Sequence, residues 1–502
     1  MRTNGVLDLM PRVLTWGLLL IAIGAFTGVG VAGDAKLLVM TALIASIVIV
    51  VWCASRPIEL ILVALFVSCA VPLPSWIPTS VSVGGVSVIA YDVIGFSLLG
   101  VVAFKLVSDH IKLHVVPFVY VVILMFGVAV GIAGNAPVTG ILQDLRGPVI
   151  VLACALSLHI IASENPSWIG RYGVRVVGLT VIWSAIASVV SLFVGTSWIS
   201  GRFISAALYT SGNVEDFGLP RILLNSGRLS TAVLCFVVAS SVAGLIPQHL
   251  KKFAILVGLS GFVVVILSFS RNGIVSLLIA LVAAMVLSVS VFASVWRVLA
   301  GLSIFGLTLY GTWLFIASVS ADARELLNSV YYGVIGRSIG GLSSDVITEE
   351  GSGQWRVVES NLAAESILSR PLTGTGFGVP YRGPVLGDVF RGNSGFGYIH
   401  NSFLWVATKL GLPVLILVVV AFGVALALLL TSSLRRGSGL ALPVLVVLVS
   451  LLPTLIIAPV PFAPSGAIVV GILIELTRRS IRLPVNQGTR GVPAVYRGSK
   501  GI

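Results

Sequence analysis

Four side chains of this 502-residue chain have types and settings suited to chemistry on a charged substrate. Arg221, Arg271 and Arg356 each lie beside an apolar run or on a predicted helix, and His400 is followed directly by Asn401. A guanidinium group keeps its charge and donates paired hydrogen bonds to phosphate oxygens. A histidine can accept a proton near neutral pH. These residues therefore suit a reaction in which a phosphate group leaves and a hydroxyl loses a proton.

The segments that must position these side chains are apolar enough to lie in lipid. Hydrophobic residues make up 57 % of the chain and charged residues 10 %, and the mean hydropathy is +1.10. A soluble domain carries about 25 % charged residues. Apolar runs of about twenty residues, the length of a membrane-spanning helix, recur along the whole chain. Because the runs are continuous rather than alternating, they favour helices over a β-barrel. We therefore expect an all-α integral membrane protein.

The predicted spans number about fourteen, within a range of about 12–14. They lie near residues 13–32, 37–53, 58–73, 88–107, 115–134, 147–163, 174–195, 229–246, 252–269, 273–292, 298–319, 412–432, 440–459 and 464–477. The chain then divides into membrane helices over 1–320, a large extracytoplasmic loop over 321–411, further membrane helices over 412–479, and a disordered cytoplasmic tail over 480–502.

The placement of charge predicts the orientation. If the N-terminus is cytoplasmic and sides alternate at each span, the cytoplasmic segments hold 18 of the 31 Lys and Arg but only 5 of the 18 Asp and Glu. The net charge of +13 then lies wholly on that side. This asymmetry follows the positive-inside rule, so we expect an inner (cytoplasmic) membrane protein with both termini in the cytoplasm. The basic balance therefore does not indicate nucleic-acid binding.

Two predicted outer connections are long, near 196–228 and 320–411. Long loops in compact proteins are usually functional. The second contains a predicted helix over Gln354–Ser369, then a glycine-rich turn over Gly374–Gly378, and it ends just after His400. In the predicted topology His400 is the only one of the five histidines on the outer side.

The order of these motifs resembles the signature of the O-antigen ligase and O-antigen polymerase superfamily, bacterial membrane glycosyltransferases that act on polyprenyl-pyrophosphate-linked sugars. The stretches that carry the resemblance are Trp355–Arg356, Arg370–Pro371–Leu372–Thr373–Gly374–Thr375–Gly376, His400–Asn401–Ser402–Phe403–Leu404 and Gly411, preceded by Ser270–Arg271–Asn272–Gly273 and Arg221–Ile222–Leu223–Leu224–Asn225–Ser226. The resemblance covers roughly residues 215–425 and implies a GT-C-like fold. The family often has Asn-Pro-Asn after its first arginine, whereas this chain continues to Arg228, so Arg221 and Arg228 are both candidates for that role.

The resemblance implies roles for the candidate residues. Arg271 and Arg356 would stabilise the leaving pyrophosphate, and His400 would act as general base. Arg221 or Arg228, together with Asn401, would bind the pyrophosphate or the glycan. Direct displacement at the anomeric carbon would invert its configuration. The sequence has no Asp-x-Asp and no outer cluster of histidines and acids, so we expect neither a metal site nor a cofactor.

The expected partners follow from this reaction. They are a polyprenyl-pyrophosphate-linked glycan donor, a glycan or lipid acceptor, membrane lipids and other polysaccharide-assembly proteins, but no nucleic acid. The product would belong to a cell-surface polysaccharide such as an O-antigen, capsule or exopolysaccharide. Whether the enzyme polymerises repeat units or ligates a finished chain stays open.

Other interpretations compete with this one. The chain could be a transporter or flippase of lipid-linked glycans, although its predicted span interiors hold almost no charged residues. Arg271 could extend its head to the lipid headgroups, Arg356 could pair with Glu359 one helical turn on, and His400 could merely pack its loop.

Overall fold

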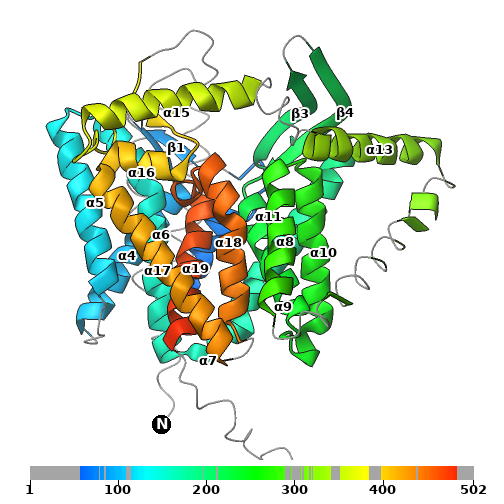
Figure 1. The fold of residues 1–502 in the computed structure, drawn as a ribbon, viewed down its shortest axis with the longest axis horizontal. Coiled ribbons are helices and arrows are strands. Elements are labelled where there is room, and N and C mark those ends of the chain that lie inside the picture. Colours follow the sequence, from blue (N-terminus) through cyan, green and yellow to red (C-terminus); the bar gives the residue numbers. More distant parts are fainter. Residues whose placement is uncertain are drawn as a thin grey trace, which may run out of the picture.

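The structure is a computed structural model, and it describes residues 57–77, 80–83, 86–108, 115–195, 197–210, 213–288, 320–340, 351–383, 397–436 and 439–482, with scattered residues between 295 and 318. The predicted spans at 13–32 and 37–53, most of the span at 298–319, and the tail beyond residue 482 lie outside the described residues. Over the rest, the chain is a bundle of long helices with smaller elements gathered at one end (Figure 1).

Six described helices are long and apolar enough to cross a membrane. They are α4 (Ala90–Ser108), α5 (Val115–Ala133), α6 (Val138–Glu164), α8 (Val174–Val194), preceded by α7 (Pro166–Trp168) and η1 (Ile169–Gly173), α10 (Lys251–Leu267), preceded by η2 (Gln248–Leu250), and α17 (Leu412–Arg436). Four shorter apolar helices are α3 (Ile58–Ala70), α9 (Gly227–Val242), α11 (Arg271–Leu287) and α18 (Ala441–Ile457), and α18 is followed by η6 (Val460–Phe462) and α19 (Pro464–Arg482). The chain is thus a predominantly helical, multi-pass membrane protein.

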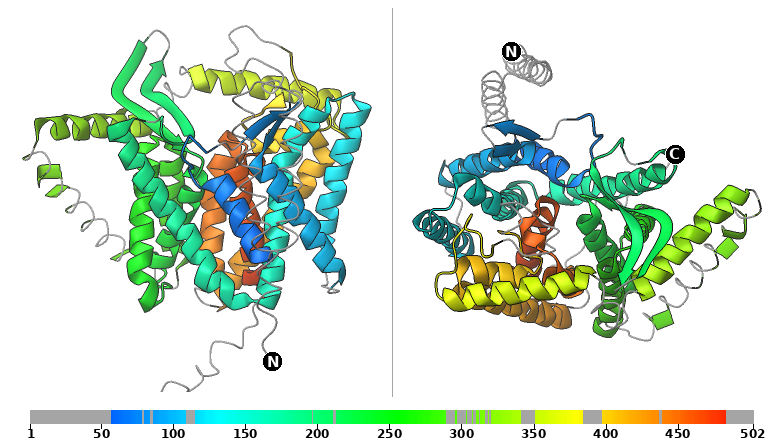
Figure 2. Two further views of the ribbon diagram at one scale, coloured as in Figure 1. Left: turned by 180° about the vertical axis from the view of Figure 1, so that it is seen from behind. Right: turned by 90° about the horizontal axis from the view of Figure 1, so that it is seen from above.

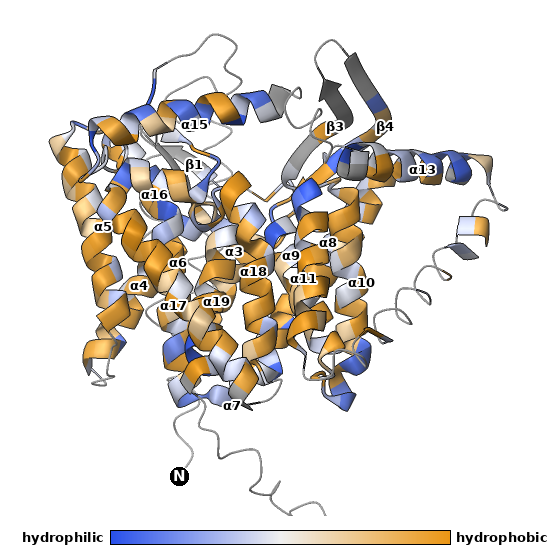
Figure 3. Cartoon of the chain, in the orientation of Figure 1, coloured by the Kyte–Doolittle hydropathy of each residue, from blue (hydrophilic) through white to orange (hydrophobic). Residues whose placement is uncertain are grey.

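The apolar surface of these helices explains their stability in lipid. Hydrophobic residues cover the sides of the bundle, and polar residues gather at its two ends (Figure 3). The most apolar span belongs to α17, yet only 6 % of its 18-residue window is buried inside the protein. An apolar helix this exposed needs lipid as its solvent. The largest buried cluster lies between α3, α4, α6, α9, α11, α18 and α19.

Most predicted span boundaries agree with the helices, but α6 begins well before its predicted start at residue 147. It already includes Val138, so Asp144 and Arg146 lie on a helix rather than in a connection. Both side chains form ion pairs within the protein. Asp144 pairs with Lys409, and Arg146 pairs with Asp92 on α4 at 3.0 Å. The prediction that helix interiors hold almost no charge therefore missed these two pairs.

Two antiparallel hairpins depart from the all-α prediction. The smaller joins β1 (Ser80–Val83) to β2 (Val86–Ile89), and the larger joins β3 (Gly201–Thr210) to β4 (Asn213–Leu224), with a register shift between Ser205 and Ala207. The larger hairpin occupies the long connection predicted near 196–228. It follows Gly195, whose φ of 76° ends α8 in a conformation that favours glycine.

One end of the bundle, which we call the loop face, carries both hairpins and three further helices (Figures 1 and 2). These are α13 (Ala321–Tyr332), continued by the π-helix η3 (Gly333–Ile339), α15 (Gly351–Ser369) and α16 (Ser402–Leu410). The predicted loop helix at Gln354–Ser369 corresponds to α15, which starts three residues earlier. In Figure 1, α15 lies across the bundle and its C-terminal end is over α5.

Candidate functional site

The glycine-rich turn is the structural base of the first part of the site. Gly374, Gly376 and Gly378 have φ values of 67°, 85° and 76°. A Cβ atom on Gly376 would lie 2.3 Å from the backbone nitrogen of Gly131 on α5, so only glycine fits there. The Thr375 N–H donates to the Thr408 carbonyl of α16 at 2.7 Å. The turn therefore fixes the C-terminal end of α16 against α5, as a structural turn rather than a nucleotide loop.

A buried ion pair strengthens this attachment. Lys409 of α16 is fully buried, and its Nζ lies 2.9 Å from Asp144 Oδ2 and 2.7 Å from the Val379 carbonyl. The same carboxylate oxygen accepts the Gly378 N–H at 2.7 Å. One carboxylate of α6 thus holds both the turn and α16. Buried charges are stabilising only when paired and hydrogen-bonded in this way.

His400 precedes α16 and is held by an acid of α15. Its Nδ1 lies 2.7 Å from Glu359 Oε2, and its backbone N–H donates to Glu359 Oε1 at 3.2 Å. The Glu359 side chain is only 4 % exposed, while the His400 side chain is 18 % exposed. The ring of Tyr398 meets the imidazole edge-on, with centroids 4.9 Å apart. A nearly buried carboxylate on Nδ1 orients the ring and favours Nε2 as the basic nitrogen.

Asn401 has a local structural task. It is the N-cap of α16, and its Oδ1 accepts the backbone N–H groups of Phe403 at 2.9 Å and Leu404 at 3.1 Å. Its side-chain amide can still donate through Nδ2. Because the cap fixes the first turn of α16, it also fixes the backbone next to His400.

Arg356 lies on the same helix as Glu359, one turn earlier, and is half-buried. In Figures 1 and 2 this N-terminal end of α15 points toward the side of the loop face that carries β3 and β4. The neighbouring Trp355 ring stacks under the Arg382 guanidinium, 5.0 Å from ring centroid to Cζ. We call Arg356, Glu359, His400 and Asn401 the histidine region.

A second group of candidates lies around the turn between α10 and α11. A small apolar cluster joins Leu219 and Phe217 of β4, Phe269 of that turn, and residues Leu326, Val330 and Val334 of α13 and η3. Each of three arginines follows a cluster member by two or three residues: Arg221 after Leu219, Arg271 after Phe269, and Arg337 after Val334. The packing of this cluster therefore brings the backbones of the three arginines close together. We call Arg221, Arg271 and Arg337 the arginine region.

Hydrogen bonds connect the same segments. Arg221 Nε donates to the Ser268 carbonyl at the end of α10, at 3.2 Å. Arg271, the first residue of α11, donates from Nε to the Arg337 carbonyl, also at 3.2 Å. Both side chains thus use one guanidinium nitrogen to hold the backbone of the region.

Arg228 lies on the first turn of α9 and is half-buried. It precedes Leu229, which belongs to the largest buried cluster rather than to the small cluster that holds Leu219 and Phe269. Of the two candidates for the first arginine, Arg221 is the one that donates to the α10–α11 turn, at the Ser268 carbonyl.

The two regions are linked through α18. Ser402 Oγ of α16 donates to the Ala458 carbonyl at the end of α18 (2.9 Å), and Thr454 Oγ1, one turn below, lies 3.3 Å from Ser276 Oγ of α11. Arg271 is five residues before Ser276, or about 7.5 Å along the helix, and Ala458 is about 6 Å above Thr454. The two regions therefore stand at a similar level of the loop face, on either side of α18.

Comparison with known families bears on this arrangement. Residues 253–419 match the O-antigen ligase family. The match confirms the predicted resemblance to the O-antigen ligase and polymerase superfamily. No curated protein matches the chain. The O-antigen ligase match supports a membrane glycosyltransferase of ligase or polymerase type, with lipid-linked glycans as its class of substrate.

The O-antigen ligase match runs from α10 into α17. It therefore contains Arg271, Arg356, His400 and Asn401 as well as Glu359, whereas Arg221 lies outside it. The matched segment therefore holds residues of both regions.

Sequence reasoning missed two residues that the structure places in contact with candidate residues, Glu359 and Arg337. Glu359 stood out only as a neighbour of Arg356, because its partner His400 lies 41 residues away and α15 had to be placed on α16 to reveal the pair. Arg337 belongs to no recognised motif. The only sequence feature that could have indicated it is its position in the loop segment after a run of apolar residues. In both cases the contact depends on tertiary packing rather than on local spacing.

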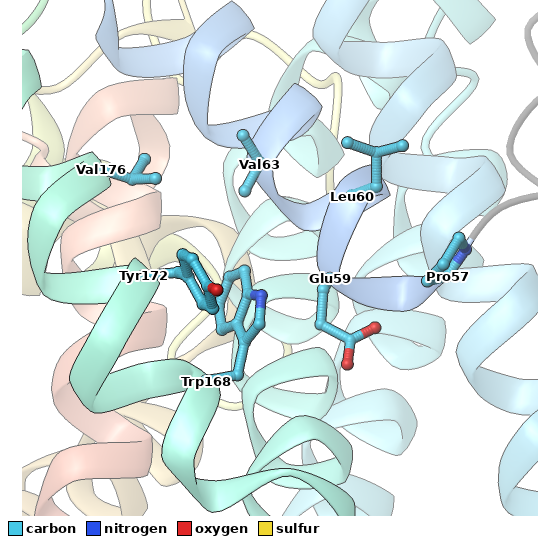
Figure 4. Close-up of a pocket in the computed structure, with 7 residues that line it drawn as sticks. All are labelled: Pro57, Glu59, Leu60, Val63, Trp168, Tyr172 and Val176. Carbon is cyan, nitrogen blue, oxygen red and sulfur yellow. The ribbon is translucent and has the colours of Figure 1, made fainter.

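An open pocket of about 450 Å³ lies between α3 and the α7–α8 segment (Figure 4), and α7 is at the end of the bundle opposite the loop face (Figure 1). Residues of α3 and of the α7–α8 segment line it, including Glu59, Trp168 and Tyr172. Aromatic side chains at this level are typical of a membrane interface. The cavity contains none of the candidate site residues.

Among the residues that the structure describes, no three His, Cys, Asp or Glu side chains gather closely enough to hold a metal ion. The arrangement of the site instead offers guanidinium groups as the source of positive charge.

Proposed function

We propose that this protein is an inverting, metal-independent glycosyltransferase that uses a polyprenyl-pyrophosphate-linked oligosaccharide as donor at the outer face of the cytoplasmic membrane. The contact between His400 and Glu359 carries the proposal, because it is the arrangement expected of an oriented general base. The donor would come from the outer leaflet, and the acceptor would be a glycan or lipid hydroxyl in cell-surface polysaccharide assembly.

The reaction divides between the two regions. The acceptor hydroxyl oxygen forms a bond to the anomeric carbon of the donor, and the bond from that carbon to the pyrophosphate oxygen breaks. The pyrophosphate leaves with the electron pair, and Arg221, Arg271 and Arg356 stabilise its negative charge. His400 Nε2 takes the acceptor proton, while Glu359 stabilises the resulting imidazolium. Attack opposite the leaving group inverts the anomeric configuration.

The position of Arg356 suits this division. It belongs to the same helix as Glu359 but lies nearer the N-terminal end of α15, the end that points toward the β3–β4 hairpin (Figure 2). It is therefore the candidate best placed to contact the donor between the leaving group and the acceptor.

A transfer assay tests the reaction. Purified protein, a polyprenyl-pyrophosphate oligosaccharide and an acceptor glycan should give an inverted product, with the rate unchanged in excess chelator. Loss of activity in chelator that magnesium or manganese restores would contradict the arginine-based account. The glycans that accumulate in a strain lacking the protein would then distinguish three functions. Single lipid-linked repeat units indicate a polymerase, and long lipid-linked chains indicate a ligase. Repeat units that stay on the cytoplasmic leaflet indicate a flippase.

Cysteine labelling tests the orientation. Cys69, Cys154 and Cys235 are buried, so exposed positions can be read against a low background once Cys53 is replaced. Ser369→Cys, at the exposed end of α15, should react in intact cells with a membrane-impermeant maleimide. Ser108→Cys, exposed at the opposite end of α4, should react only after the cells are opened. The reverse pattern would invert the proposed topology.

A further inference from the structure

Arg337 is the one arginine of the arginine region that no sequence motif marks. It lies in the π-helix η3, and π-helical turns are often found at functional sites because they displace side chains from the α-helical register. Arg271 Nε donates to the Arg337 carbonyl at 3.2 Å. The arginine that begins α11 therefore holds the backbone of Arg337 directly.

The position of η3 is fixed by two glycines. A Cβ atom on Gly333 would lie 2.8 Å from the Phe269 ring, and one on Gly336 would lie 2.6 Å from the Phe217 ring. These close approaches seat η3 against both the α10–α11 turn and β4. Because Arg337 follows directly after Gly336, its Cα cannot move far from the segments that carry Arg221 and Arg271.

Burial gives this placement an electrostatic consequence. One nitrogen of each guanidinium, Arg271 Nη2 and Arg337 Nη1, is buried from solvent. Two cationic side chains partly removed from water on neighbouring segments raise the local positive potential, and an anion bound there is correspondingly stabilised. A pyrophosphate diester carries two negative charges, so a site for it gains from a second cation beside Arg271.

We propose that Arg337 binds the pyrophosphate of the donor together with Arg221 and Arg271. The inference rests on the proposed function and adds a residue that distinguishes a pyrophosphate from a single phosphate. A phospholipid headgroup offers only one phosphate charge. Loss of Arg337 should therefore reduce the preference for a pyrophosphate over a single phosphate group.

The test measures binding rather than transfer. Wild-type protein, Arg337→Gln and the control Arg324→Gln are placed in nanodiscs of zwitterionic lipid and titrated with farnesyl pyrophosphate and, separately, farnesyl monophosphate. Arg324 is a matched control because it is an exposed arginine of α13 in the same loop segment. Arg337→Gln should weaken pyrophosphate binding about tenfold and monophosphate binding much less. Arg324→Gln should change neither.

A further variant and the pattern of affinities distinguish failure of this inference from failure of the proposed function. Arg337→Lys keeps a cation and should lose less affinity than Arg337→Gln, which guards against a variant that merely disturbs η3. Equal pyrophosphate affinity in wild type and Arg337→Gln overturns the inference while leaving the proposed function intact. Equal losses for both ligands, or for the control, also overturn it. If wild type itself binds neither ligand better than empty nanodiscs do, the pyrophosphate donor and the inference both fail.

Discussion

The histidine region and the arginine region are built in different ways, although both lie on the loop face. The histidine region is fixed by backbone contacts between glycines, by the buried Lys409–Asp144 pair and by a helix cap. The arginine region is mounted on a small apolar cluster between a hairpin, a turn and a π-helix. The contacts of the histidine region fix the orientation of a single imidazole ring. The packing of the arginine region instead places several cationic side chains near one another.

The difference matches the demands of the two tasks. Proton transfer depends on one nitrogen being within hydrogen-bond reach of one hydroxyl, so small displacements are costly. Binding of a pyrophosphate depends on summed charge and tolerates several arrangements of long side chains. Substitutions in the histidine region should therefore have the larger effects, and the following experiments can break or sharpen that contrast.

The largest effect is expected from His400→Ala. Removing a general base should lower transfer roughly 10²–10⁴-fold while the protein stays inserted and abundant. The measurement is the rate of sugar transfer by purified variants at equal folded concentration. His249→Ala, at the opposite end of the bundle, is the control and should keep full activity. If His400→Ala and His400→Gln both transfer at near wild-type rates, His400 is not the base.

The next largest effect concerns stability. Lys409→Met leaves Asp144 buried without its cation, which should lower the free energy of unfolding by about 3–5 kcal/mol. Lys105→Met is a matched control, because the Lys105–Glu164 pair is 32 % and 40 % exposed and should cost about 1 kcal/mol or less. Unfolding in detergent measures both. Similar losses for the two variants would show that the buried pair does not hold the histidine region.

Glu359→Gln should reduce transfer about ten- to hundredfold, a part of the contribution of the base itself. Glutamine keeps the size of the side chain, but it cannot stabilise an imidazolium by charge. The effect should fall on kcat rather than on KM, because Glu359 acts through His400. Glu365→Gln, an exposed acid of the same helix, is the control. Full activity in Glu359→Gln would reduce the pair to a structural contact.

Arg271→Lys should have a smaller effect, at least about tenfold in kcat/KM, or about 1.4 kcal/mol of transition-state stabilisation. Lysine keeps the charge but loses the bidentate geometry and the Nε bond to Arg337. Arg324→Lys serves as control. Near-normal activity in Arg271→Lys would favour the alternative in which Arg271 only reaches the lipid headgroups.

The sequence predicted most described helices closely, and it named part of the candidate site. Uninterrupted apolar runs report helices directly, so most described boundaries differ from the prediction by only a few residues. The start of α6 was missed because charged residues break its apolar run, and those charges are tolerated only because Lys409 and Asp92 pair with them. His400 and Arg271 lie in motifs, whereas Glu359 and Arg337 are defined by contacts across 41 and 66 positions of sequence.

The smallest expected effect is at Asn401, where the roles of cap and ligand can be separated. Asn401→Ala removes the acceptor of two backbone N–H groups and should cost about 1 kcal/mol of stability. Asn401→Ser retains a cap oxygen and should restore most of that stability. Serine cannot replace the amide Nδ2, which is the donor that remains for a glycan or phosphate oxygen once Oδ1 caps the helix.

Transfer by Asn401→Ser therefore decides between the two roles. If Nδ2 binds substrate, this stable variant should still transfer several times more slowly than wild type, since a neutral hydrogen bond contributes about 0.5–1.5 kcal/mol. If Asn401 only caps α16, Asn401→Ser should regain wild-type transfer together with wild-type stability. That outcome would assign substrate binding in the histidine region to Arg356 alone, and it would leave His400 as the single residue through which α16 takes part in the reaction.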